Sequence, residues 1–198
     1  MEALISVILP YAGERPQTQA MLRSLQASID IPYEVVIVSS PSEHPLQPAD
    51  LIPHAVVRHE PYLPIAGAWD VGAQLARAPY LAFCYPDLRF GWRALDHLVS
   101  TLQRQELWAV SPTVTRGAFP TDFDHQSRLA AYLPCVLHAG MHLDCSVWTF
   151  EAWRRLRPLA DLRQPIAEHL SACGYPPQRI ENALVHACRS LDSAIPEA

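Results

Sequence analysis

The sequence contains no lysine: all fifteen basic residues among its 198 are arginine, against twenty acidic residues, for a formal net charge of -5. Without lysine, covalent chemistry through a lysine amine is excluded. The arginines form no basic run, so the chain lacks the charge pattern of proteins that bind nucleic acid or an anionic membrane surface. We therefore expect neither of these as its partner.

Long apolar segments are also missing. No stretch approaches the roughly 18 apolar residues that a membrane span needs, and the N-terminus shows no signal-peptide pattern. The cysteines are odd in number, widely spaced and free of any Cys-x-x-Cys pair, which is typical of buried thiols in a reducing compartment. They are Cys84, Cys135, Cys145, Cys173 and Cys188. We expect a soluble, cytoplasmic protein without a membrane span.

At 198 residues and 49% hydrophobic content, the chain suits one well-buried domain. Its first part alternates short apolar runs with amphipathic patterns, which predicts a parallel α/β sheet. The predicted strands are 4–9, 33–38, 55–58 and 80–84, and the predicted helices are 16–29 and 65–76. The segment 42–53 carries three prolines and is predicted to be a surface loop.

The later part is less regular. The spacing of its apolar residues predicts a helix at 92–105, a strand at 108–114, a strand pair within 136–147 and helices at 150–156 and 166–173. The segment 117–134 is typical of an acceptor flap or of a plain connection. From 177 onward, apolar residues at helical spacing predict a final helix that packs on this domain or on a partner, so an oligomer through this helix is an open alternative.

Asp87 is the most informative acidic residue. It follows the strand 80–84, and the carboxyl ends of strands in open α/β sheets are where ligands bind. A carboxylate there suits a metal ion or a phosphate-bound cation. The alternative is that Asp87 caps a helix or starts a turn.

Several segments occur in a characteristic order: 5–11 (ISVILPY), 22–25 (LRSL), 33–38 (YEVVIV), 67–72 (GAWDVG), 80–87 (YLAFCYPD) and 148–153 (WTFEAW). Together they resemble the family-2 inverting glycosyltransferases of the GT-A fold. The resemblance implies a single GT-A domain with a Rossmann-like, mostly parallel sheet flanked by helices. Its halves would be a nucleotide-binding part at 1–114 and an acceptor side at 115–176, followed by the helix at 177–198.

The resemblance also implies a donor site for a nucleotide-activated sugar, with an acceptor that the sequence leaves unidentified. The positions that match the family's donor-binding motifs are Pro10, Tyr11, Ser39, Ser40, Asp70, Tyr85, Asp87 and Arg89. Ser39 and Ser40 stand where the family has an Asp pair, and Tyr85 stands where it has the first Asp of its metal motif. Asp87 is thus the single carboxylate left for magnesium or manganese, with Arg89 and Arg93 as alternative phosphate ligands.

The family's general base has no direct counterpart here. The acids in the matching region are Asp144 and Asp161, which we take as candidates, and Glu168. His138, His142 and Asp144 have metal-ligand types at close spacing, although ordinary polar packing is the better explanation, and one of these histidines is an alternative base. The acids Asp122 and Asp124 are interpreted as a solvated turn.

Two other functions stay open. A non-catalytic relative that keeps the fold as a binding or assembly module would explain the altered polar positions. Nucleotidyl transfer would need a glycine-rich loop with Lys or Arg after the first strand, and 11–15 (YAGER) is a poor version of such a loop. Sugar transfer is the function we expect first.

Overall fold

The computed structural model describes residues 2–132, 135–139, 145–157, 166–172 and 178–188. Its first part follows the predicted order closely. The elements are β1 (Ile5–Tyr11), α1 (Arg15–Ser28), β2 (Tyr33–Ser39), the short 3-10 helix η1 (Pro48–Asp50), β3 (Ala55–His59), α2 (Ile65–Leu75) and β4 (Tyr80–Cys84). Strands β3, β2, β1 and β4 lie side by side in this order and are all parallel.

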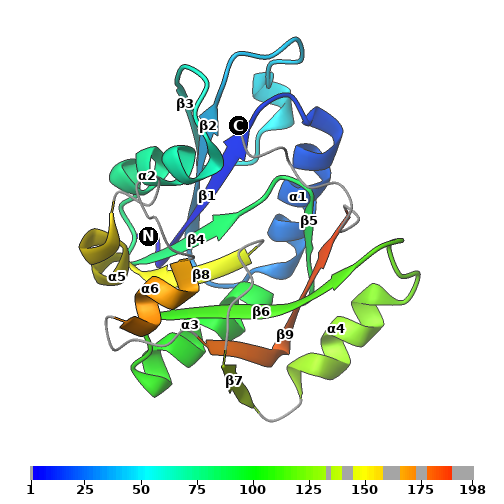
Figure 1. The fold of residues 1–198 in the computed structure, drawn as a ribbon. Helices are drawn as coiled ribbons and strands as arrows, with labels where there is room; N and C mark the ends of the chain where they lie inside the picture. The colour runs from blue at the N-terminus through cyan, green and yellow to red at the C-terminus, as the bar shows by residue number, and fades with distance from the viewer. Residues whose placement is uncertain (1, 133–134, 140–144, 158–165, 173–177, 189–198) are drawn as a thin grey trace.

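The later part completes a nine-stranded sheet (Figure 1). Its elements are β5 (Leu88–Phe90), α3 (Ala94–Gln105), β6 (Ala109–Arg116), α4 (Phe123–Ala131), β7 (Leu137–Ala139), β8 (Cys145–Thr149), α5 (Phe150–Leu156), α6 (Ile166–Ala172) and β9 (Gln178–Ala187). The order continues from β4 through β8, β6 and β9 to β5, with β7 also paired to β9. Here only β6 and β9 are parallel, so the sheet is parallel in its first part and mixed in its second.

The predicted final helix is wrong over 178–187, where the chain forms β9. This strand lies between β6 on one side and β5 and β7 on the other. Its register against β6 shifts between Pro112 and Thr113. A bulge of this kind interrupts the two-residue alternation, so the spacing of Ile180 and Leu184 matches a helix although both belong to a strand.

Three further elements differ from the expectation. Helix α4 lies inside the segment predicted to be irregular, and β5 occupies 88–90, where no element was predicted. The two strands expected within 136–147 are present as β7 and β8, but β7 pairs with β9 while β8 pairs with β4 and β6. These partners are remote in sequence, so local patterns do not reveal them.

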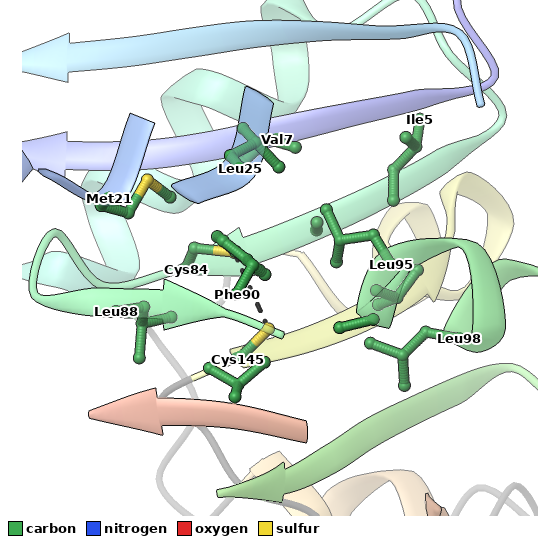
Figure 2. Close-up of a cluster of buried hydrophobic side chains, with 14 of the residues drawn as sticks. Ile5, Val7, Met21, Leu25, Cys84, Leu88, Phe90, Leu95, Leu98 and Cys145 are labelled. Atoms are coloured by element: carbon green, nitrogen blue, oxygen red, sulfur yellow. Dashed lines mark hydrogen bonds between the residues drawn. The ribbon is translucent and has the colours of Figure 1, made fainter. Parts of the chain in front are cut away.

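Two hydrophobic cores cover the two faces of the sheet. The first lies under α1 and α3 and includes Met21, Leu25, Leu95 and Leu98, and Figure 2 shows these side chains gathered around Cys84 and Phe90. The second lies under α2, α5 and α6 and is aromatic. It contains Trp69, Phe83, Trp148 and Trp153 together with Ile8 and Leu170. Among the described residues, no helix is long and apolar enough to cross a membrane.

Helix α2 approaches β1 unusually closely. A Cβ atom placed on Gly72 would lie 2.3 Å from Cγ2 of Ile8, closer than two carbon atoms can pack. Ile8 is fully buried in the sheet and belongs to the second core. The absence of a side chain at position 72 therefore sets the distance between α2 and the sheet.

Candidate functional site

The carboxyl ends of β1, β2 and β4 meet at one edge of the sheet. In the parallel ladder, Tyr11 lies opposite Ser39, and Ile8 lies opposite Phe83. The residues that follow β4, including Asp87, therefore leave the sheet at the same edge as the ends of β1 and β2. The structure thus brings together the predicted segments around 10–11, 39–40 and 85–89, as parallel strands require.

Backbone hydrogen bonds hold the two serines at this edge. The Ser40 N–H donates to the Tyr11 carbonyl at 2.9 Å, and the Glu60 N–H donates to the Ser39 carbonyl at 3.0 Å. Ser39 is buried, while Ser40 is half-buried. Because hydroxyl groups both donate and accept, these serines can bind a ribose or a base by hydrogen bonds but supply no charge.

Tyr11 lies beneath the chain that follows β2. Its side chain is 1% exposed, and its hydroxyl donates to the His44 carbonyl. Burial raises the pKa of Tyr11, and the nearby Glu14 carboxylate adds to the effect. Pro10, its neighbour in β1, is half-buried. The phenol is therefore covered by the segment after β2 in this structure.

Asp70 and Tyr85 contact the aromatic core. The indole Nε1–H of Trp153 donates to Asp70 Oδ1 at 2.9 Å, and Asp70 is 6% exposed. The Tyr85 ring meets Trp69 edge to face, with centroids 5.4 Å apart. Both predicted donor positions thus take part in packing around α2, and Asp70 is held by α5.

Asp87 is anchored through its backbone to the end of β9. The Cys188 N–H donates to the Asp87 carbonyl at 3.2 Å, and both carboxylate oxygens are covered from solvent. Arg89 follows on β5, where its Nη1 donates to the Leu88 carbonyl at 2.8 Å and reaches the Gln17 carbonyl of α1 at 3.5 Å. A carboxylate and a guanidinium are therefore neighbours along this part of the edge.

His186 is a residue of this region that the sequence analysis missed. It lies opposite Arg89 in the β5–β9 pair and is fully buried. Its Nε2 lies 3.2 Å from the Gly117 carbonyl and its Nδ1 lies 2.9 Å from Thr115 Oγ1. Because a carbonyl only accepts, Nε2 carries the proton and Nδ1 accepts from the threonine hydroxyl.

The surroundings keep His186 neutral. Burial is the main cause that lowers its pKa, and the charge of Arg89 acts in the same direction, against Gly117 and Asp87. The rings of Phe119 and Phe123 pack against the imidazole at centroid distances of 5.2 and 5.9 Å. No sequence signal identified this histidine, because its contacts depend on strand pairing that the sequence pattern did not predict.

The remaining candidates divide into two groups. Asp144, Asp161 and His142 lie outside the described residues, while His138 lies on β7 and is half-buried. Arg93 forms ion pairs with Asp30 at 3.0 Å and with Asp96 at 3.7 Å, which join α3 to the end of α1. In the described part of the structure, the role of Arg93 is thus to join α3 to the end of α1.

The acidic pair Asp122 and Asp124 begins helix α4. Asp122 precedes its first residue and accepts from Gln126 at 2.8 Å, and Asp124 pairs with Arg128 at 3.0 Å. Across the described ranges, no group of three or more His, Cys, Asp or Glu residues could hold a metal ion. A cation at Asp87 would therefore need further ligands from phosphate oxygens or water, which is common for magnesium.

No protein-family model and no curated protein sequence matches this chain. Solved structures, in contrast, do match the chain in fold. The mannosyltransferase PcManGT from Pyrobaculum calidifontis, in complex with GDP-Man and Mn²⁺, superposes with a TM-score of 0.71 at 19% identity, covering 98% of this chain and 59% of that one. GalNAc-T7, crystallised with UDP, GalNAc and Mn²⁺, gives a TM-score of 0.75 at 14% identity, covering 100% of this chain and 45% of that one.

The chain therefore spans less than two thirds of the length of either structure. At sequence identities this low, the structural similarity establishes the fold alone. Substrate and activity have to be argued from the site. The mixed sheet, its helix layers and these superpositions establish that the chain has the GT-A glycosyltransferase fold.

Proposed function

We propose that the protein transfers a sugar from a nucleotide-activated donor to an acceptor, with the nucleotide bound at the carboxyl edge of β1, β2 and β4. The observation that carries the proposal is the place of Asp87, a carboxylate that follows β4 at the edge where β2 ends in Ser39 and continues into Ser40. Two solved structures that share the GT-A fold with this chain were determined with GDP-Man or UDP and with Mn²⁺. These bound ligands support a nucleotide-sugar donor for this chain.

In this proposal Asp87 faces the diphosphate through a divalent cation. A bare carboxylate repels a diphosphate, so binding should depend on magnesium or manganese, which takes its other ligands from phosphate and water. When bound, the cation offsets the negative charge that grows on the leaving diphosphate. Arg89, two residues after Asp87 on β5, adds a positive charge, while Ser39 and Ser40 bind the base or ribose by hydrogen bonds.

The acceptor side is proposed to lie beyond β6. The carbonyl of Gly117, at the start of the loop 117–122, is held by His186, and Phe119 in this loop is 51% exposed. Asp144 and Asp161 are our candidates for the general base of an inverting reaction. An NMR assay of the anomeric proton in the product would test the inverting course directly.

The decisive experiment is thermal melting against GDP, UDP and their sugars, each with and without Mn²⁺ or Mg²⁺. A ligand at a hundred times its Kd adds about 2.7 kcal/mol of stability, or roughly 5 to 10 °C at this chain length. We expect one nucleotide to give such a shift with the cation and to lose it in Asp87→Asn. Asp124→Asn, which changes an exposed acid in the first turn of α4, is the matched control and should keep the shift.

A second function is favoured by one observation. Asp70 and Tyr85, two of the predicted donor positions, pack against Trp153 and Trp69 in the core. Donor positions that pack in the core suit a non-catalytic relative that retains the fold as a binding or assembly module. If none of the nucleotides shifts the melting temperature with either cation, the donor site is refuted and the module becomes the better explanation.

A further inference from the structure

The segment 41–50, between β2 and β3, covers the end of β1. Its His44 carbonyl accepts the hydroxyl proton of Tyr11, the aromatic residue that ends β1. Tyr11 is 1% exposed as a result of this cover and of the core beneath it. If the donor base binds at this edge, the segment lies over the phenol that would meet it.

The segment itself is held by few buried groups. Most of its residues are exposed, and Ser42 and Leu46 are half-buried. Its one buried side chain belongs to Asp50, at the end of η1. Apart from Leu46, which packs against the first core, and the Tyr11–His44 hydrogen bond, the attachment of this segment depends on the partners of that carboxylate.

Those partners lie on the first turns of α1. Arg15 binds Asp50 through both oxygens, with Nη2 to Oδ1 at 2.9 Å and Nε to Oδ2 at 2.8 Å. Gln19 Nε2 donates to Oδ1 at 2.6 Å, and the Gln47 N–H donates to Oδ2 at 2.7 Å from within the segment. The Asp50 side chain is 2% exposed, while Arg15 is 41% exposed. One carboxylate therefore fastens the segment to α1.

We propose that the segment 41–50 is a strap that closes the donor end of the carboxyl edge, that the Asp50–Arg15 contact is its latch, and that a nucleoside diphosphate binds after the strap lifts. This inference rests on the proposed function, because the strap guards the donor site only if a nucleotide binds there. A closed form that must open first lowers the apparent affinity by the fraction of open molecules. Loosening the latch should therefore strengthen nucleotide binding.

The test uses Asp50→Ala, with Asp124→Asn as control because the Asp124–Arg128 pair is an exposed ion pair on α4, outside the strap. Hydrogen exchange is measured on peptides that cover 41–50 and on peptides from β1 and β2. We expect exchange in the strap to become about tenfold faster in Asp50→Ala, with β1 and β2 unchanged. The Kd for GDP or UDP with Mn²⁺, measured by calorimetry, should fall by the same factor, about tenfold.

Each of the other outcomes would refute a different part of the proposal. Unchanged strap exchange would overturn the latch. Faster exchange with an unchanged or weaker Kd would overturn the claim that the strap covers the donor site, while nucleotide binding by the natural protein would leave the proposed function intact. Faster exchange with no nucleotide binding by either protein would refute both. If Asp50→Ala fails to fold, Arg15→Gln opens the same contact from the more exposed side, and Arg15→Lys should restore part of it.

Discussion

The contact between α2 and β1 makes a sharp prediction at Gly72. Its Cα faces Ile8 so closely that an added Cβ would lie 2.3 Å from Ile8 Cγ2. The added Cβ would also lie 3.4 Å from Val38 Cγ2, and because Ile8 and Val38 are both buried in the core, neither side chain can turn into open solvent. In Gly72→Ala, helix α2 must therefore shift away from the sheet.

The loss of unfolding free energy in Gly72→Ala can be estimated from two opposing effects. Overpacking a core typically costs about 1 to 3 kcal/mol, and replacing a helical glycine by alanine returns up to about 1 kcal/mol. We expect Gly72→Ala to lower the free energy of unfolding by about 1 to 2 kcal/mol. Gly67→Ala is the matched control in the same helix, because the atoms nearest to its Cβ would be Pro64 Cδ, Pro64 Cγ and Leu63 Cβ at 3.6 to 3.7 Å, an ordinary packing distance. This control should be neutral or stabilised by up to about 1 kcal/mol.

Urea unfolding followed by tryptophan fluorescence measures both variants, since Trp69 and Trp148 lie in the affected core. A double-mutant cycle with Ile8→Ala, which removes the clashing Cγ2 atom, should show that the cost of Gly72→Ala nearly vanishes in that background. If Gly72→Ala is as stable as Gly67→Ala, or if the cycle shows no coupling, the close approach of α2 to β1 is refuted.

Two further predictions concern titratable groups. Burial lowers the pKa of His186 and of His97, so the unfolded chain binds more protons and stability is lost as pH falls below the ordinary value near 6.5. Urea midpoints from pH 8 to 5 should decrease, and His186→Gln should flatten part of that decrease; an equal slope in the variant would contradict the buried neutral imidazole. Burial also raises the pKa of the Cys84 thiol, so a disulfide reagent should label exposed Cys135 and Cys188 in the native protein, whereas Cys84 should react only after unfolding.

The first part of the fold was predictable because its signals are local. Parallel strands buried on both faces read as apolar runs that end at proline or glycine, and the strand at 80–84 was predicted with its observed bounds. Helix α5 likewise begins at Phe150 and ends at Leu156, as predicted, and Thr149 caps it by accepting the Ala152 N–H at 3.1 Å. Such elements carry their start and stop signals within a few residues.

The later part depends on partners far apart in sequence. Strand β9 was predicted to be a helix because its bulge disturbs the alternation that identifies strands, and only pairing with β6, β5 and β7 decides its form. The same pairing places His186 beside Thr115 and Gly117, some seventy residues away. The sequence could not indicate that contact.

The sequence by itself determined the succession of the parallel strands along the chain, the GT-A resemblance and the place of Asp87 after a strand's carboxyl end, because each follows from local pattern and from the geometry of parallel sheets. Tertiary structure alone decided which polar side chains are available there. It buried Asp70 against Trp153, covered Tyr11 with the segment 41–50 and fastened that segment through Asp50 to Arg15. The physical reason is that a polar group's role depends on its burial and its partners, and both are set by residues distant in sequence.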